Sequence, residues 1–221
     1  MLQLVEQLLH QYGRDKTLNN NVSLNNLRQI LTPIINNLND EGFFVINPDR
    51  ISIASMRDEN IGSTNLIQIH HSRILDRAFD GDTIFVPPIE SDVALPNSKN
   101  EVENRSSMFV ATPIRNDAGN IIAVLSLRIN PKYYFSRVTA LGRFGQTGET
   151  YAFDHFGTLL TESRFLEQLK KLQLVEVNEQ SSLNVQLRDP GGNLLLGFTP
   201  KQSINTSPYT TMAKQALQGN N

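Results

Sequence analysis

The 221-residue sequence contains no cysteine and no tryptophan. Without cysteine, disulfide bonds, thiolate zinc sites and a cysteine nucleophile are all excluded. The net charge of −2 and a pI near 6.1 give no electrostatic basis for binding nucleic acid or an anionic membrane surface. No run of about 18 apolar residues occurs, and the N-terminus lacks a signal-peptide pattern. Any membrane attachment is therefore expected only through flanking segments outside this chain.

The most distinctive stretch, residues 141–165, begins with a glycine-rich loop and continues into a hairpin pattern. Thr150–Phe153 and Thr158–Thr161 have the composition of strands, and the segment between them is typical of a turn. A similar pattern occurs in residues 44–57, which align without a gap with residues 151–164. Both segments have an aromatic residue, an Asn or Asp at the turn, an apolar return strand and a final arginine. This shared order predicts two related α/β modules in tandem.

Apolar periodicity and turn residues predict the remaining elements. Helices are predicted over residues 2–12, 24–41, 66–79, 131–138, 166–172 and 208–217. Strands are predicted over residues 43–46, 50–55, 83–86, 107–112, 120–129, 183–187 and 194–198. The polar, proline-containing segment 89–105 is typical of a lid or a disordered loop. The order of these elements predicts an α+β fold, in which an antiparallel sheet has helices on one side.

Four stretches occur in this order: FFVINPDRISIASMRDENIG, GDTIFVPPI, SMFVATPIRNDAGNIIAVLSLRINP and LGRFGQTGETYAFDHFGTLLTESRF. Together they resemble the double Cache family, the extracytoplasmic sensor domains of bacterial membrane receptors, which consist of two PAS-like modules on a long N-terminal helix. The resemblance implies an N-terminal helical segment (1–42, the end of a stalk helix), a membrane-distal module (43–130) and a linker with a partial membrane-proximal module (131–221). The second module is expected to be incomplete at its C-terminus, because two closing strands have no counterpart there.

The resemblance also implies a function in signal transduction. The chain would lie on the periplasmic face of a bacterial inner membrane and bind a small molecule for a receptor such as a sensor histidine kinase of a two-component system. The output domain would lie outside this chain, so the chain itself is expected not to be an enzyme. Amino-acid-binding members carry an arginine followed closely by tryptophan and tyrosine in the distal module. This sequence has no tryptophan, so that signature is absent.

Two arginines, Arg57 and Arg128, have the most informative positions. Arg128 lies in phase with Ser126, whereas the opposite phase of the same predicted strand is apolar and should face the helical core. A pocket between the Ser126 face and the segment 57–107 would offer an arginine fork to a carboxylate or phosphate. The predicted ligand-binding residues are Ser55, Arg57, Asp58, Phe85, Met108, Val110, Ser126 and Arg128. Alternatively, both arginines are surface ion-pair partners of acids such as Asp58.

Arg128→Ala is expected to weaken an anionic ligand with little effect on the fold. If neither arginine contributes to binding, Asp58 with an amine-bearing ligand is the next hypothesis.

Other motifs predict no catalysis, metal or cofactor. A phosphate-binding loop needs a lysine after its last glycine and a helix after that, but here Glu149 occupies the position and a strand follows. His70 and His71 are adjacent on a predicted helix and point about 100° apart, so a solvated surface role is favoured over a metal site. No G-x-S-x-G elbow occurs, and Asp154 lies in a turn, where it caps the backbone.

The alternative to a ligand-binding module is a ligand-free module that dimerises or docks a periplasmic protein. Leu2, Val5, Leu8 and Leu9 form one stripe with helical spacing. Because this stripe exceeds what one short helix can bury alone, any homodimer is expected to form through the N-terminal helix. An enzyme is the third hypothesis, and no motif supports it.

Overall fold

The computed structural model describes residues 1–14, 18, 21–38, 41–92, 95–96, 102–103, 106–146 and 148–219. The chain divides into two compact units. The first unit comprises Met1–Asp92 and Ser107–Asn130, and the second comprises Val93–Ser106 and Pro131–Asn221. None of the helices formed by the described residues is long and apolar enough to cross a membrane.

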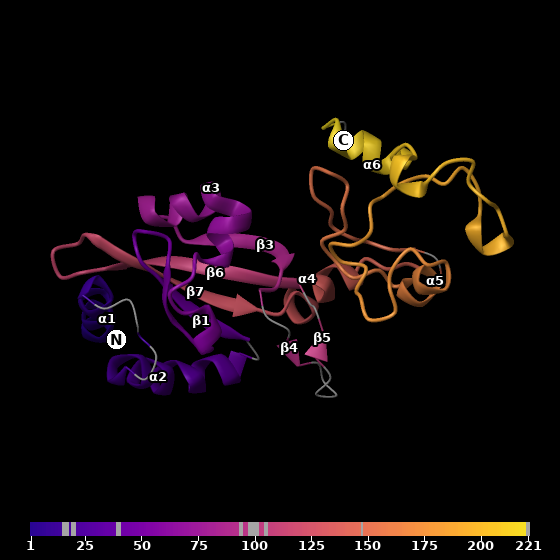
Figure 1. Cartoon of the computed structure of the whole chain (residues 1–221). Coiled ribbons are helices and arrows are strands. Elements are labelled where there is room, and N and C mark those ends of the chain that lie inside the picture. The colour runs from indigo at the N-terminus through magenta and orange to yellow at the C-terminus, as the bar shows by residue number, and fades with distance from the viewer. Residues whose placement is uncertain are drawn as a thin grey trace. The chain divides into compact units, whose positions relative to one another are not determined.

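The first unit is built on a five-stranded sheet (Figure 1). Its strands are β1 (Gly42–Ile46), β2 (Ser52–Ser55), β3 (Ile84–Glu90), β6 (Ser106–Arg115) and β7 (Ile121–Ile129). They lie in the order β2-β1-β7-β6-β3, and the pairs β1–β2, β1–β7 and β6–β7 are antiparallel. The predicted α+β class and antiparallel sheet are confirmed, and the strand order is that of a PAS-like module.

Two short strands, β4 (Leu95–Pro96) and β5 (Val102–Glu103), form a separate antiparallel pair. β3 extends four residues beyond the predicted end at Val86, through two prolines. Because β3 is an edge strand, only one of its two sides pairs with a neighbour, and an edge strand tolerates proline better than a central strand does.

Helices cover both faces of the five-stranded sheet, so the expectation of helices on one side only is wrong (Figure 1). The helices are α1 (Leu2–Arg14), α2 (Val22–Leu38) and α3 (Leu66–Asp80). Both alternating phases of β1 are apolar: Phe43 and Val45 pack with α1 and α2, whereas Phe44 and Ile46 pack with α3. A strand that is apolar on both sides must be covered on both, because exposed apolar surface costs about 25 cal/mol per Å².

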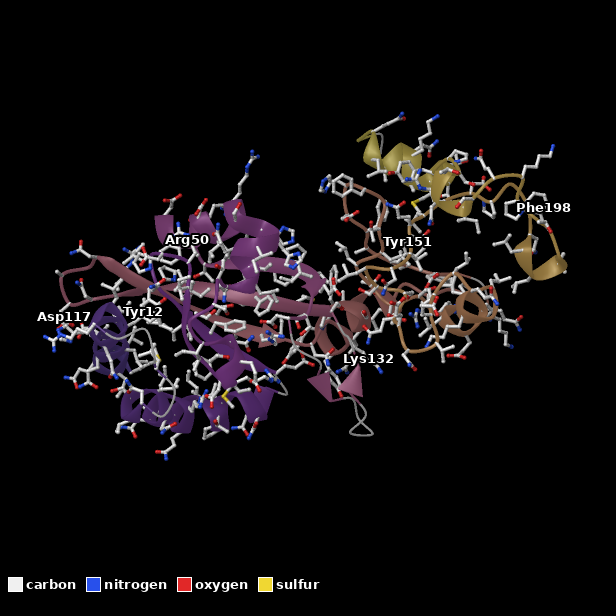
Figure 2. The ribbon with its side chains drawn as sticks, in the orientation of Figure 1. Tyr12, Arg50, Asp117, Lys132, Tyr151 and Phe198 are labelled. Atoms are coloured by element: carbon white, nitrogen blue, oxygen red, sulfur yellow. The ribbon has the colours of Figure 1, made fainter. Side chains whose placement is uncertain are left out.

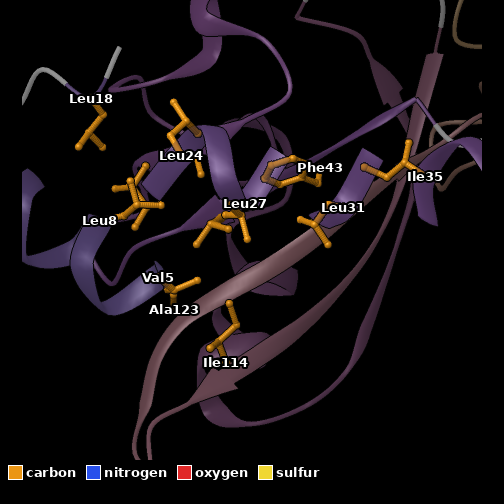
Figure 3. Packing of buried hydrophobic residues seen from close by; sticks show 13 residues of the cluster. Val5, Leu8, Leu18, Leu24, Leu27, Leu31, Ile35, Phe43, Ile114 and Ala123 are labelled. Carbon is orange, nitrogen blue, oxygen red and sulfur yellow. The ribbon is translucent and has the colours of Figure 1, made fainter. Parts of the chain in front are cut away.

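The apolar stripe of α1 is buried within the first unit. Val5 and Leu8 are fully buried in a cluster with α2 and one face of the sheet (Figure 3). Leu2 and Leu9 are partly buried beside them. The premise that this stripe needs a second copy of the chain is therefore wrong, because α2 and the sheet already cover it.

Besides β4 and β5, the described residues of the second unit form three helices and two 3₁₀ turns. They are α4 (Pro131–Ala140), α5 (Leu166–Lys171), α6 (Thr211–Leu217), η2 (Leu194–Leu196) and η3 (Ile204–Thr206). The strands predicted here do not form regular strands, because its described residues 131–146 and 148–219 make only isolated bridges. Residues 194–198 turn instead, since Asn193 accepts the amide of Leu195 and Gly197 takes a left-handed φ of 84°. Figure 2 shows the side chains of both units and labels Tyr151 and Phe198 in the second.

The two aligned hairpins have the same hydrogen bonds at their turns. In the first, Asn47 donates its amide to the carbonyl of Ile51, and its side chain accepts the amide of Ile51. In the second, Asp154 donates to the carbonyl of Thr158, and its carboxylate accepts the amide of Thr158. The third residue after the Asn or Asp has a left-handed φ in both cases, 65° at Arg50 and 71° at the glycine that matches it.

The equivalence continues beyond these turns. Arg57 donates from Nη1 to the carbonyl of Glu41, and Arg164 donates from Nη1 to the carbonyl of Gly148. A third segment pairs with each return strand, through the bridges Ile51↔Thr64 and Thr158↔Gln186. The alignment made from the sequence is thus confirmed in three dimensions for this hairpin, although only its final arginine is identical.

Candidate functional site

The candidate site lies on the face of the sheet that α3 covers. Arg128 in β7 lies opposite Phe109 in β6, and Ser126 lies opposite Phe44 in β1. The side chain of Arg128 is only 1% exposed, and its guanidinium carbon lies 5.2 Å and 5.3 Å from the ring centroids of Phe44 and Phe109. Two aromatic rings therefore hold this arginine in a largely apolar setting, where its charge needs polar partners.

Arg128 finds those partners at the ends of β3 and β6. It donates from Nη1 to Ser91 Oγ at 2.8 Å and to Ser107 Oγ at 3.2 Å. It donates from Nη2 to Asp92 Oδ1 at 2.5 Å, and Asn60 donates from Nδ2 to Asp92 Oδ2 at 2.6 Å. We refer to Arg128, Asp92, Asn60, Ser91 and Ser107 as the Arg128 cluster. A buried, charge-assisted bond of this kind fixes the guanidinium tightly.

Arg57 lies next to the Arg128 cluster. Its guanidinium donates to the backbone carbonyl of Glu41 at 3.2 Å. Burial lowers the pKa of Arg57, and the charge of Arg128 lowers it further, while the carboxylates of Glu41, Asp92 and Glu59 act in the opposite direction. Because the net shift of the pKa is downward, these carboxylates do not fully offset burial and the repulsion between the two arginines.

Two serines complete the polar part of this face. Ser55 is buried and accepts the amide of Arg57 at its Oγ, at 3.2 Å. Ser126 is fully buried, and its Oγ has no hydrogen-bond partner among the described residues. A buried hydroxyl without a partner costs about 1–3 kcal/mol, so a ligand that supplied one would gain that energy.

The structure brings together four of the predicted residues, Ser55, Arg57, Ser126 and Arg128. It places Met108 and Val110 on the opposite face, because they lie opposite Ile129 and Leu127 rather than opposite residues of the Arg128 phase. The predicted pocket walls are therefore wrong for these two residues.

Two further predicted residues also lie apart from the Arg128 cluster. Phe85 is half exposed between Ile84 and Val86, which are buried in the α3 cluster, so it points away from that face. Asp58 pairs with Arg28 of α2 at 2.7 Å, with its side chain 56% exposed. Arg128 does pair with a nearby acid, as the alternative interpretation expected, but the acid is Asp92 and the arginine is buried rather than on the surface.

The sequence analysis missed Asn60, Ser91, Asp92 and Ser107. One signal was available for Ser107, which shares the alternation of Phe109 in β6. Asp92 lies in the polar segment 89–105, and a buried arginine requires a carboxylate nearby. No sequence pattern showed which of the acids in that region would reach it.

Glu149 has a structural role in the glycine loop of the second unit. Its carboxylate accepts the backbone amide of Arg164 at 2.6 Å and the hydroxyl of Ser163 at 3.2 Å. This carboxylate therefore connects the loop to the end of the return segment.

No family model matches the chain, and no curated protein matches it. Among solved structures, the ligand-binding domain of the Pseudomonas aeruginosa PAO1 amino acid chemoreceptor PctC, in complex with GABA, is similar at 13% identity. The match covers 74% of this chain and 66% of that chain, with a TM-score of 0.42. The ligand-binding domain of the Campylobacter jejuni chemoreceptor Tlp3, in complex with 4-methylisoleucine, is similar at 14% identity over 76% of this chain and 62% of that chain, with a TM-score of 0.45.

The sensor domain of the V. cholerae histidine kinase DctB is similar at 15% identity over 59% of this chain and 49% of that chain, with a TM-score of 0.35. The chain covers less than two thirds of the length of each of these three solved chains.

Proposed function

We propose that this chain is the extracytoplasmic sensor domain of a bacterial transmembrane signalling receptor, and that its first unit binds a small molecule with an anionic group at the Arg128 cluster. The observation that carries the proposal is the buried guanidinium of Arg128, which lies against two aromatic rings and bonds to Asp92, with the half-buried Arg57 near enough for the charge of Arg128 to lower its pKa in addition to burial. The four double Cache stretches in the sequence support the receptor class.

The chemistry of the site favours an anion. Arg128 bonds to the carboxylate of Asp92, and Arg57 adds a second positive charge nearby. The hydroxyl of Ser126, which has no hydrogen-bond partner among the described residues, lies on the same face. Arginine presents a planar fork that suits a carboxylate or phosphate. The rings of Phe44 and Phe109 provide the apolar contact that small-ligand sites also need.

A ligand-free docking or dimerisation module is the less supported function. That hypothesis depended on an apolar stripe along α1, but Val5 and Leu8 are fully buried in the core of the first unit. The Arg128 cluster therefore supports a ligand site, whereas the apolar stripe that suggested a dimer interface is buried within the first unit.

The proposal predicts that simple anions raise the melting temperature of the chain and that Arg57 contributes to their binding. A thermal-shift screen of carboxylates, phosphate, sulfate and amines identifies a binder, and calorimetric titration measures its affinity. Arg57→Ala should weaken an anionic binder by about tenfold to a hundredfold, because a partly buried charge partner is lost.

Arg77→Ala is the matched control, since Arg77 pairs with Asp82 on the exposed surface, and it should leave the affinity unchanged. If no anion shifts the melting temperature, or if Arg57→Ala binds as well as the wild type does, the proposed anion site is wrong.

A further inference from the structure

We propose that Asp92 is an internal anion that occupies the ligand position at Arg128, so that an incoming anionic ligand competes with it. This inference rests on the proposed function, and it adds what the site holds when no ligand is bound. Binding then depends on replacing one carboxylate by another, and the affinity of the site is set partly by how well Asp92 competes.

Asp92 is held as a bound carboxylate would be. Arg128 donates to its Oδ1 and Asn60 donates to its Oδ2, at 2.5 Å and 2.6 Å. Both oxygens thus accept a hydrogen bond from a different element, one from β7 and one from η1 (Asp58–Asn60). A ligand carboxylate at the same place would find the same two donors already oriented.

The donors are fixed more firmly than the carboxylate. Arg128 lies in a central strand between β1 and β6 and is 1% exposed, whereas the side chain of Asp92 is 23% exposed. Asp92 also lies two residues beyond the end of β3, outside the sheet. Exchanging the carboxylate therefore leaves the sheet intact, and the rest of the site keeps its geometry.

The charges around Arg128 explain why another anion can displace Asp92. Burial lowers the pKa of Arg57, and the charge of Arg128 lowers it further, so Arg57 brings a second positive charge close enough to Arg128 for both to attract an incoming anion. Removing the charge of Asp92 would leave Arg128 with two serine hydroxyls and a neutral side chain. A buried arginine without a carboxylate is costly, and an external anion then relieves that cost.

The opposite role for Asp92 is binding a positively charged group of the ligand. The two roles give effects of opposite sign when Asp92 is neutralised. If Asp92 competes with the ligand, an anion binds more tightly to the variant. If Asp92 holds a cationic group, a cation binds more weakly to the variant, and an anion gains little.

The experiment compares the wild-type chain with Asp92→Asn, using acetate, sulfate and methylammonium as probes in calorimetric titration. Asp58→Asn is the matched control, because it removes the same charge from an exposed pair with Arg28. Asp92→Asn should bind acetate or sulfate at least about tenfold more tightly than the wild type, since its internal competitor is gone. Asp58→Asn should stay within about twofold.

A second variant keeps the inference testable if Asp92→Asn folds poorly. Asp92→Ser also removes the carboxylate, keeps a small polar side chain and leaves both donors, Arg128 and Asn60, to the probe. It should likewise bind acetate at least about tenfold more tightly than the wild type, because no internal carboxylate competes for these donors. Circular dichroism before titration identifies folded variants.

The outcomes separate the inference from the proposed function. If the wild type binds anions while folded Asp92→Asn and Asp92→Ser bind them equally or more weakly, Asp92 is not a competitor, and the anion site itself remains. Loss of methylammonium binding in Asp92→Asn would assign Asp92 to a cationic group and overturn the inference. If no protein, wild type or variant, binds any anion, then the proposed function fails and the inference fails with it.

Discussion

Arg128 shows how much a single residue's burial changes the consequences of its loss. Its side chain bonds to two serines and a carboxylate at the ends of two other strands and lies over two adjacent aromatic rings. The strand alternation correctly indicated that Arg128 lies on the face opposite the continuous apolar phase. The alternation could not show that α3 covers the apolar part of this face, or that the residues just after β3 supply polar partners to a buried Arg128.

Arg128→Ala should therefore lower the free energy of unfolding by about 3 kcal/mol, because it leaves the carboxylate of Asp92 without its main partner in a partly buried site. The expectation that this substitution barely changes the fold is thus replaced by the opposite one. Chemical denaturation measures the difference, and Arg77→Ala, at an exposed ion pair, is the control. If Arg128→Ala lowers the free energy of unfolding no more than the control does, the Arg128 cluster does not stabilise the sheet.

At the scale of elements, local patterns and long-range pairing were not equally predictable. Helix α3 begins after Asn65, whose side chain accepts the amide of Ile67, and ends at Gly81 in a left-handed conformation. The residues that cap a helix lie next to it in the sequence, so its ends can be predicted locally. The predicted helix 66–79 ends only one residue before the observed end of α3. The face occupied by Met108 depends on which residue of β7 lies opposite it. That register is set by long-range pairing, which one strand alone does not reveal.

The placement of α1 gives a prediction at the same scale. Val5→Ala and Leu8→Ala should each destabilise the chain, by about 1–3 and 2–5 kcal/mol respectively, because both side chains are fully buried between α1, α2 and the sheet. Ile30→Ala is the control, since Ile30 in α2 is 46% exposed. Denaturation curves and light scattering test the prediction together. A change in oligomeric mass without a loss of stability would restore α1 as an interface between copies.

The whole molecule contains the same hairpin in two different settings. In the first unit, β1 pairs with β2 on one side and with β7 on the other. In the second unit, Phe153 pairs with Leu159, and the described residues place no strand on its other side. The buried apolar side chains of the second unit's described part are Pro131, Leu159, Val175 and Ala213. Two equivalent turns are thus supported by very different amounts of buried apolar surface.

This contrast predicts unequal local stability in the intact chain. Backbone amides of residues 44–55 should exchange with solvent more slowly than those of residues 151–162. The free energy of local opening should be about 3 kcal/mol larger for the first hairpin. The reason is that opening β1 exposes two apolar clusters and breaks strand pairing on both sides. Hydrogen exchange followed by mass spectrometry compares the two hairpins within one sample. Their common turn geometry is the internal control, so a difference in protection reports the surrounding sheet and core. Equal protection would mean that the second hairpin draws comparable support from contacts outside its own bridges.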